Sequence, residues 1–376
     1  MIHFSTGTNM EQVVQKIFND ADIKINGDRP WDIKVHNPKF YSKVLAGGSI
    51  ALGETYMDGY WDADRLDEFF NRLLKARIDR KAVTPSLILY ALKSKILNAQ
   101  TKSSSKKVAE IHYDLGNEFY SQMLDKRMQY TCAYFKDTDS LEEAQEKKLE
   151  MICRKIHLKK GDKVLELGCG WGGFAKYAAE KYGANVTAYN ISKEQVKYAR
   201  ENTKGLPVKI IEADYREAHG HFDKVVSIGM CEHVGYKNYK TLMEVAHKCL
   251  KKHGIFLLHT IGRDTSTTHT DPWIEKYIFP NSMIPSVKQL SASFEGRFVV
   301  EDWHNFGTDY DRTLMEWYRN FDKNWEKFKK QYGERFYRMW KYYLMSCAGA
   351  FRSRRTQLWQ IVLSKDGVIG GYKPTR

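Results

Sequence analysis

The chain has 376 residues, 42% of them hydrophobic, and a formal net charge of +14 at pH 7. Because this length exceeds that of a usual single domain, we expect one larger domain of roughly 200–270 residues and a smaller one. The longest uninterrupted apolar run covers residues 87–92, far fewer than the roughly 20 residues that span a bilayer. The N-terminus lacks a basic region followed by an apolar stretch. We therefore expect no transmembrane helix, no secretory signal and a cytoplasmic location.

The positive charge is concentrated in two segments. Residues 65–107 contain eleven Lys or Arg and three Asp or Glu. Residues 312–355 contain twelve Lys or Arg and four Asp or Glu. An anionic partner is expected beside them, with nucleic acid and anionic lipid headgroups as candidates. The alternative is an ordinary solvated surface of Lys-rich helices. The six cysteines show no CxxC or Cys/His spacing, so neither a zinc site nor a disulfide framework is expected.

Residues 9–80 are expected to form a small, mostly helical unit. Helices are predicted there over 11–21, after Asn37-Pro38, and over 65–76 with Asp64 as the cap.

The next segment, residues 82–98, is amphipathic, which indicates a helix that packs on the core or lies at a membrane interface. The polar, serine-rich stretch 99–107 is expected to be a linker. The predicted domains are therefore a helical, lipid-associated domain over 1–98 and a second domain over 108–376.

Beyond residue 108 the pattern changes to alternating strands and helices. A long helix is expected over 140–157, strands at 163–167, 186–189, 208–212, 224–228 and 255–260, and helices at 174–182, 193–202 and 237–250. Aromatic-rich helices follow within 310–358, and a final strand at 357–363. This order predicts an α/β fold with a doubly wound, Rossmann-like parallel sheet, which binds ligands at the carboxyl ends of its strands.

The first of these strands ends in closely spaced glycines. Gly168, Gly170 and Gly172 permit a turn with positive φ that approaches a ligand without a Cβ, and the next helix points its N-terminal amides into the same space. Such a turn binds either a pyrophosphate or S-adenosylmethionine (SAM). Glu166 favours SAM, because a carboxylate would repel a pyrophosphate but can support a sulfonium cofactor that carries an ammonium group.

The next two strand ends supply polar side chains suited to the rest of SAM. Asn190 and Gln195 can hydrogen-bond ribose hydroxyls, and Asp214 and Tyr215 suit the edge and face of an adenine. Each of these residues, taken alone, could equally stabilise a turn or cap a helix. Their joint placement at consecutive strand ends favours SAM.

The fourth and fifth strand ends concern the substrate. Residues 229–235 lack the Asn/Asp-Pro-Pro-Tyr signature with which base-modifying methyltransferases hold a planar amine. Glu232 stands there instead, and His259 ends the fifth strand, so both are expected in one cleft. Such a pair suits proton transfer or the binding of a small anion. His259 alone could be an ordinary core histidine.

Many segments, taken in order, resemble the bacterial cyclopropane-fatty-acyl-phospholipid synthases. They are GETYMDGYW at 53–61, HYDLGN at 112–117, QYTCAYF at 129–135, LELGCGWGG at 165–173, EADYRE at 212–217, GMCEHVG at 229–235, LLHTIG at 257–262, DPWIEKYIFPN at 271–281, EDWHNFGTDYDRTLMEWY at 301–318 and SCAGAFRSR at 346–354. The resemblance covers nearly the whole chain, including the N-terminal unit that the related mycolic-acid cyclopropane synthases lack.

The resemblance implies a SAM-dependent enzyme that adds a methylene bridge across the cis double bond of an acyl chain esterified in a membrane phospholipid. It also implies a bound bicarbonate ion and a homodimer. By matching position, Glu232, His259 and Tyr318 correspond to side-chain ligands of that anion, with main-chain contacts from Cys132 and Ile261. We assign Tyr130 and Thr131, in the same segment as Cys132, to the cofactor site.

This chemistry is consistent with those residues. An alkene that takes up the methyl group becomes a carbocation that water would destroy, so the pocket must be dry, and aromatic faces can stabilise the charge. The candidate aromatic residues are Tyr113, Tyr130, Tyr134, Phe135, Trp303, Trp317 and Tyr318. Bicarbonate can accept the proton lost as the ring closes. The basic segments and the amphipathic segment 82–98 are expected to hold the enzyme on the inner face of the cell membrane.

Three alternatives stay open. The chain could methylate an unsaturated lipid without ring closure, act as a nucleic-acid methyltransferase, or bind lipid without catalysis. The second would need an RNA-binding module or a base-gripping motif, and we find neither, so no nucleic-acid partner is expected. The third conflicts with the intact glycine turn and anion-site residues.

Overall fold

The structure is a computed structural model that describes residues 10–78 and 115–376. The predicted amphipathic segment 82–98, the predicted linker 99–107 and Tyr113 lie outside the described residues. The chain forms two compact units. Unit 1 contains the described residues of Met1–Leu97 together with His269–Pro280 and Leu314–Thr356, and unit 2 contains those of Asn98–Thr268, Asn281–Thr313 and Gln357–Arg376. The predicted boundary at 98–108 stays a prediction, but two later segments belong to unit 1.

Within the described residues, unit 2 is built on a seven-stranded sheet with the order β5-β4-β3-β6-β7-β9-β8. Its strands are β3 (Lys163–Leu167), β4 (Asn185–Asn190), β5 (Val208–Glu212), β6 (Phe222–Ile228), β7 (Leu250–Arg263), β8 (Val299–Asn305) and β9 (Thr356–Ser364). The pairs from β5 to β7 are parallel, and β8 runs antiparallel to β9. The predicted α/β fold with a mostly parallel sheet is confirmed, whereas β8 has no counterpart among the predicted strands.

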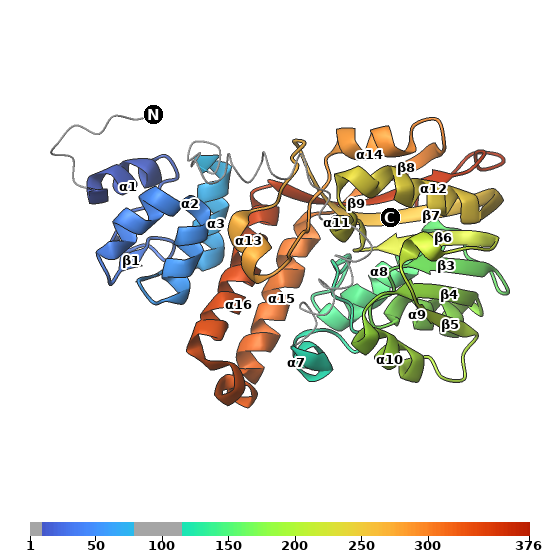
Figure 1. The fold of residues 1–376 in the computed structure, drawn as a ribbon, viewed down its shortest axis with the longest axis horizontal. Coiled ribbons are helices and arrows are strands. Elements are labelled where there is room, and N and C mark those ends of the chain that lie inside the picture. Colours follow the sequence, from blue (N-terminus) through green and yellow to red (C-terminus); the bar gives the residue numbers. More distant parts are fainter. Residues whose placement is uncertain (1–9, 79–114) are drawn as a thin grey trace. The chain divides into compact units, whose positions relative to one another are not determined.

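Helices cover both faces of this sheet (Figure 1). One buried cluster contains side chains of α8 (Leu141–Lys155), α9 (Gly173–Tyr182) and α10 (Lys193–Asn202), and the other contains those of α12 (Tyr239–Cys249) and α14 (Val287–Phe294). Successive side chains of β3 alternate between the clusters, with Val164 in the first and Leu165 in the second. This doubly wound arrangement brings the carboxyl ends of β3 to β7 to one edge.

Serine side chains cap two of the helices that cover the sheet, α8 and α10. Ser140 accepts a hydrogen bond from the backbone N–H of Glu143 at the start of α8, and Ser192 accepts one from Gln195 at the start of α10. Each cap satisfies a donor that a helix leaves unpaired. The remaining helices are α7 (Gly116–Met123), α11 (Cys231–Val234) and α15 (Thr308–Asn324), of which α15 continues into unit 1.

Unit 1 is mostly helical, as predicted. Its helices are α1 (Met10–Asn19), α2 (Lys39–Met57), α3 (Leu66–Lys75), α13 (Pro272–Tyr277) and α16 (Lys329–Arg352), and β1 (Lys34–Val35) pairs antiparallel with β2 (Trp61–Asp62), on the other side of α2 in the chain. The prediction of Asp64 as the cap of α3 is wrong, because Arg65 occupies the cap position and makes no side-chain cap bond.

Helices α3 and α16 pack closely in unit 1. A Cβ added at Gly349 would lie 2.6 Å from Cβ of Phe70, so only glycine permits this approach. Arg352 of α16 also donates to the buried carboxylate of Asp67 at 2.6 Å. Within residues 10–78 and 115–376, no helix is both long and apolar enough to cross a membrane.

Candidate functional site

The glycine turn after β3 has the predicted backbone. Gly168, Gly170 and Gly172 have φ values of 82°, 52° and 81°. Residues other than glycine rarely adopt such a backbone conformation. A Cβ on Gly168 would lie 2.8 Å from the Met230 side chain, whereas one on Gly170 would meet nothing within 4 Å. Gly170 therefore faces open space at the carboxyl end of β3, where a ligand can approach the backbone.

Glu166 of β3 carries a carboxyl group suited to a cation. It accepts a hydrogen bond from the backbone N–H of Ala175 in the first turn of α9. Its Oε2 atom is buried and has no hydrogen-bond partner in the described part of the chain. Burial raises the pKa of this carboxyl to about 8. An ammonium group would supply the missing partner, so the residues present fit the amino-acid end of SAM.

The second strand end holds Asn190 and Gln195 together. Asn190 Nδ2 donates to the carbonyl oxygen of Gly170 at 3.0 Å and to Gln195 Oε1 at 2.9 Å, and Asn190 Oδ1 accepts from the N–H of Ser192. The two amide hydrogens of Asn190 are thus both used, one on the glycine turn and one on Gln195. The donor left for a ribose hydroxyl at this point is Nε2 of Gln195.

Asp214 and Tyr215 follow β5 as predicted. Asp214 Oδ1 accepts from the N–H of Arg216 at 2.9 Å, and its Oδ2 lies 3.4 Å from the Arg216 guanidinium. The Tyr215 hydroxyl is buried with no hydrogen-bond partner among the described residues. Asp214 thus caps a short turn and still presents further lone pairs, while Tyr215 offers an unused polar atom.

The ends of β6 and β7 bring Glu232 and His259 to one place. His259 lies opposite Ile228 in the parallel register, and its carbonyl oxygen accepts from the N–H of Gly229 at 2.9 Å. Glu232, in α11 just after β6, accepts from the N–H of Ile261 at 2.6 Å through Oε1. Glu232 therefore follows the end of β6 as predicted, whereas β7 continues to Arg263, so His259 lies within its strand, opposite the last residue of β6.

Each of these side chains keeps one unused polar atom. Glu232 Oε2 and His259 Nε2 are both buried without a hydrogen-bond partner in residues 10–78 and 115–376. Gln360 Nε2 donates to His259 Nδ1 at 3.2 Å, which leaves the ring proton on Nε2 as a donor. Burial raises the pKa of Glu232 to about 7 and lowers the pKa of His259 well below its ordinary value. A donor and a carboxyl that can share a proton suit a small oxyanion.

The QYTCAYF segment lies against this edge of the sheet. A Cβ on Gly229 would lie 2.5 Å from Cγ2 of Thr131, so Thr131 packs on the end of β6. Cys132 follows it, fully buried, and burial raises the pKa of its thiol well above the ordinary value. The side chain therefore stays a thiol, which agrees with a backbone role.

Tyr318 is the one residue of the predicted anion site that falls outside unit 2. It belongs to unit 1, where its hydroxyl lies 3.4 Å from that of Tyr337. Trp317 is fully buried in the same unit. In unit 2, Glu232 contacts Ile261, and both His259 and Thr131, the neighbour of Cys132, contact Gly229. The parts of Cys132 and Tyr318 in the anion site stay predictions.

Two of the predicted aromatic residues of unit 2, Tyr134 and Trp303, have different surroundings. The Tyr134 ring lies edge-on to Phe306 at 5.4 Å, and Phe306 lies 6.0 Å from the His259 ring. Trp303 instead packs on the core through Phe294 and Trp359. Tyr134 is therefore beside the candidate site, whereas Trp303 has a packing role.

Three residues with buried polar contacts at this edge were not predicted: Lys148, Gln145 and Gln360. Lys148 Nζ donates to Gln129 Oε1 and Thr131 Oγ1, and Gln145 Nε2 donates to the carbonyl of Thr131. A signal existed for two of them. Lys148 shares the helix face of Leu141, Ala144 and Ile152, and Gln360 interrupts an apolar strand.

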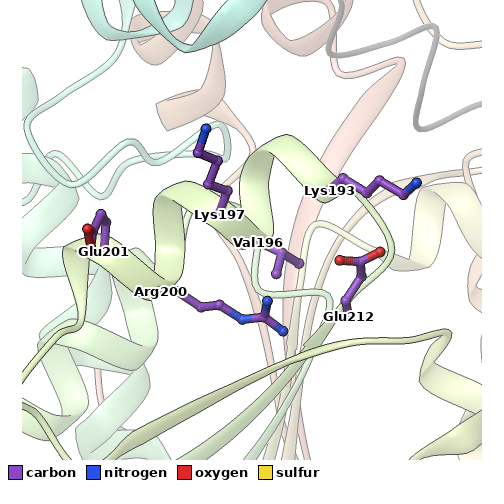
Figure 2. A pocket seen from close by; sticks show the side chains of 6 residues that line it. All are labelled: Lys193, Val196, Lys197, Arg200, Glu201 and Glu212. Carbon is purple, nitrogen blue, oxygen red and sulfur yellow. The ribbon is translucent and has the colours of Figure 1, made fainter.

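A separate hollow lies between α10 and the end of β5 (Figure 2). It is lined by Lys193, Val196, Lys197, Arg200, Glu201 and Glu212. It mixes both charge signs and includes none of the predicted site residues, so we assign no ligand to it.

Comparison with known proteins identifies the family. The family described as mycolic acid cyclopropane synthetase matches residues 100–361. The chain belongs to this family. The cyclopropane-fatty-acyl-phospholipid synthase of Escherichia coli (strain K12) is 50% identical over 371 residues, which are 98% of this chain and 96% of that protein. A probable fatty acid methyltransferase of Pseudomonas putida is 37% identical and covers 72% of this chain and 72% of that protein.

Solved structures of cyclopropane synthases show the same fold. The cyclopropane synthase MmaA2 from Mycobacterium tuberculosis is 28% identical, with a TM-score of 0.65 over 69% of this chain and 98% of that chain. The mycolic acid cyclopropane synthase CmaA1, complexed with S-adenosylhomocysteine (SAH) and CTAB, gives the same values. The chain is therefore an enzyme of the cyclopropane synthase family with the SAM-dependent methyltransferase fold. All its predicted site residues lie within the matched range 100–361.

Proposed function

We propose that the chain transfers a methylene group from SAM to the cis double bond of unsaturated acyl chains in membrane phospholipids, which forms a cyclopropane ring. The observation that carries the proposal is a pair of buried atoms, Glu232 Oε2 and His259 Nε2, that have no hydrogen-bond partner among the described residues. Glu232 follows the end of β6 and His259 lies opposite that end, on the same edge of the sheet as the glycine turn. The 50% identity to a synthase named for this reaction supports the substrate class.

In this proposal the carboxyl ends of β3 to β5 hold SAM. Glu166 pairs with the ammonium group, the turn of Gly168, Gly170 and Gly172 admits the cofactor, and Asn190 supports that turn. The remaining cofactor contacts come from Tyr130, Thr131, Gln195, Asp214 and Tyr215. When bound, SAM supplies the methyl group that the alkene carbon takes up.

The ends of β6 and β7 hold the second group, bicarbonate. Glu232 and His259 orient the ion through their unused atoms, Cys132 and Ile261 contribute backbone contacts, and Tyr318 adds a hydrogen bond. When bound, bicarbonate supplies the base that takes a proton from the added carbon as the ring closes. Tyr134 and Phe306, next to His259, present aromatic faces that stabilise positive charge on the acyl chain and exclude water.

A second candidate function is methylation without ring closure. It is favoured by the Pseudomonas putida relative, whose name describes a fatty acid methyltransferase. The two candidates predict different products from one substrate, since ring formation adds CH₂ with loss of the double bond, whereas a reduced or hydroxylated methyl product gains further hydrogen or oxygen.

The test is to incubate the purified protein with labelled SAM and vesicles of unsaturated phospholipid, with and without added bicarbonate. Label in a lipid whose mass has increased by CH₂, with product formation dependent on bicarbonate, supports the whole proposal. A labelled lipid carrying extra hydrogen or oxygen selects the second candidate. No labelled lipid under any condition overturns both.

Membrane association is part of the same proposal. The basic segments 65–107 and 312–355 would hold the enzyme on anionic lipid at the inner face of the cell membrane. Neutral substitutions at Lys93, Lys95, Lys102, Lys106 and Lys107 should weaken vesicle binding and reduce its dependence on salt. Unchanged vesicle binding would show that segment 65–107 does not hold the enzyme on the membrane. The homodimer stays a prediction, to be tested by the mass of the protein in solution.

A further inference from the structure

Lys148 is a buried cation that the proposed chemistry does not use. Its side chain lies on α8 with no exposed surface, and Nζ donates to Gln129 Oε1 at 2.6 Å and to Thr131 Oγ1 at 2.9 Å. Burial lowers the pKa of this ammonium group to about 8, and the nearby carboxylate of Asp125 opposes that shift. A buried ammonium group costs several kcal/mol of desolvation, so a site that retains one gains something specific from it.

The two acceptors of Lys148 reach opposite sides of the candidate site. Gln129 packs on the start of α9, because a Cβ on Gly173 would lie 2.1 Å from Gln129 Nε2. Thr131 packs on the end of β6, against Gly229. The stretch from Gln129 to Thr131 thus extends from the glycine turn to the strand end that precedes Glu232.

Side chains, rather than a helix or sheet, hold this stretch in place. Its residues have no regular secondary structure. Asp125 Oδ1 accepts from the N–H of Gln129 at 2.8 Å, and Gln145 Nε2 donates to the carbonyl of Thr131 at 2.9 Å. Lys148 holds the side chains at both ends of the stretch through one atom, since a compact ammonium group carries three donors.

We propose that Lys148 is a positioning residue for SAM, which holds Gln129 and Thr131 together and so fixes the wall of the site between Gly173 and Gly229. This inference rests on the assignment of the stretch to the SAM site under the proposed function. Without the ammonium group, Gln129 Oε1 and Thr131 Oγ1 lose a buried donor and the stretch gains alternative conformations. Binding of SAM must then restore the order, which lowers affinity.

The test compares Lys148→Met with Lys155→Met. Lys155 is a matched control because it lies on the same helix, seven residues on, and is equally buried, with Nζ 3.0 Å from His304 Nδ1. We expect Lys148→Met to raise the Kd for SAH and the KM for SAM about tenfold, with a smaller fall in kcat. Lys155→Met should leave the Kd for SAH within about twofold of the wild-type value.

A second variant keeps the inference testable if Lys148→Met does not fold. Thr131→Val removes one acceptor and should also raise the Kd, and in the double variant the two effects should not add. If either Lys148→Met or Thr131→Val is folded, by its thermal midpoint and circular dichroism, and binds SAH like the wild type, the inference is wrong. A wild-type protein that does not bind SAH would instead overturn the SAM assignment itself.

Discussion

The backbone N–H of Ile261 donates to Glu232 Oε1 at 2.6 Å, and Oε2 of the same carboxyl group is buried with no hydrogen-bond partner among the described residues. One oxygen is therefore fixed by the neighbouring strand while the other is left for a ligand. This division explains how one side chain is both held in place and available for binding.

Glu232→Gln should separate catalysis from cofactor binding. The amide keeps an oxygen for the Ile261 bond but replaces the unused oxygen by a group that cannot accept or share a proton. We expect cyclopropane formation to fall at least about 100-fold, with the Kd for SAH unchanged. Labelled-lipid assays measure cyclopropane formation, and calorimetry measures the Kd for SAH. Glu244→Gln, an exposed residue of α12, is the control, and equal loss in both variants would contradict the assignment.

Glu166 should make SAH binding depend on pH. Its carboxyl holds a proton up to about pH 8 in the protein alone, so below that pH a cationic ligand must first displace the proton. The affinity should rise up to about tenfold per pH unit from pH 6 to 8 and then level off. Calorimetry across this range checks the slope.

Glu166→Gln provides the comparison. It should abolish the slope and bind SAH more weakly at pH 8. Since the native carboxyl is protonated where the unfolded one is not, it contributes stability that is lost as pH rises from 4.5 to about 8. The stability of the Glu166→Gln variant should not show this decrease between pH 4.5 and 8. If the SAH affinity of the variant depends on pH as strongly as that of the wild type, Glu166 does not contact the ligand.

Gly229→Ala should impair the site through Thr131. The substitution places a Cβ 2.5 Å from Cγ2 of Thr131 at a φ of 69°. We expect the Kd for SAH to rise about tenfold. Thr131→Ser removes Cγ2 but keeps the hydroxyl that Lys148 needs, so the double variant should recover most of the affinity.

The control for that pair is Gly205→Ala. Gly205 has a φ of 82°, and a Cβ added there would meet nothing within 4 Å. We therefore expect backbone strain to lower the free energy of unfolding by about 1–2 kcal/mol, and the Kd for SAH to stay at its wild-type value. Failure of the serine substitution to restore affinity would mean that the contact with Thr131 is not the cause.

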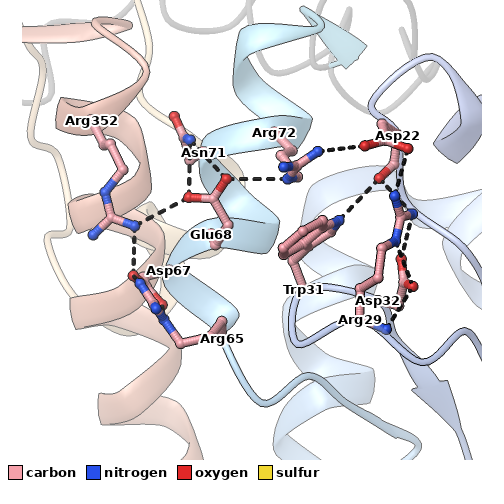
Figure 3. A network of polar contacts seen from close by, with 10 residues as sticks. All are labelled: Asp22, Arg29, Trp31, Asp32, Arg65, Asp67, Glu68, Asn71, Arg72 and Arg352. Carbon is pink, nitrogen blue, oxygen red and sulfur yellow. Dashed lines mark hydrogen bonds and ion pairs between the residues drawn. The ribbon is translucent and has the colours of Figure 1, made fainter.

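Asp67 of unit 1 should stabilise the fold in a pH-dependent way (Figure 3). Burial raises its pKa, but hydrogen bonds from Arg65 and Arg352 outweigh burial and lower it to about 2. Its contribution is therefore present above about pH 4 and lost as pH falls toward 2. Asp67→Asn should lower the free energy of unfolding by about 2 kcal/mol at pH 7, measured by urea titration.

The matched comparison is Asp58→Asn, which removes a more exposed ion pair with Arg335 in the same unit. It should cost less than about 1 kcal/mol. The difference between the Asp67 variant and the wild type should shrink at pH 3. Equal costs for both variants at pH 7 would contradict the role given to burial.

The elements of unit 2 were predictable because their signals are local. Residues 193–202 and 208–212 form a helix and a strand with the predicted bounds, since a serine cap and an apolar run mark them. The strand β8 was not predictable in this way, because its sequence VVEDWHN is mixed and its partner β9 lies far along the chain. The composition of unit 1 also depends on distant contacts, such as Gly349 against Phe70.

The candidate site was partly predictable for a related reason. Strand ends are visible in the sequence, so Glu166, Glu232 and His259 could be placed at one edge of the sheet. The buried role of Lys148 was not apparent, because a lysine in a charged helix is usually solvated and only its position on the apolar face distinguishes it.

Unit 1 is assembled from segments that are synthesised at different times. Gly349 contacts Phe70 and Arg352 pairs with Asp67, yet roughly 280 residues separate the partners along the chain, so Gly349 and Arg352 are made long after Phe70 and Asp67. At a translation rate of about 5–20 residues per second, the residues of α16 are made on the order of tens of seconds after those of α3. During that interval Phe70 lacks the close contact with Gly349, although Phe69 already has Phe18 and Trp61 as neighbours, so the packing of unit 1 is completed by its C-terminal segment.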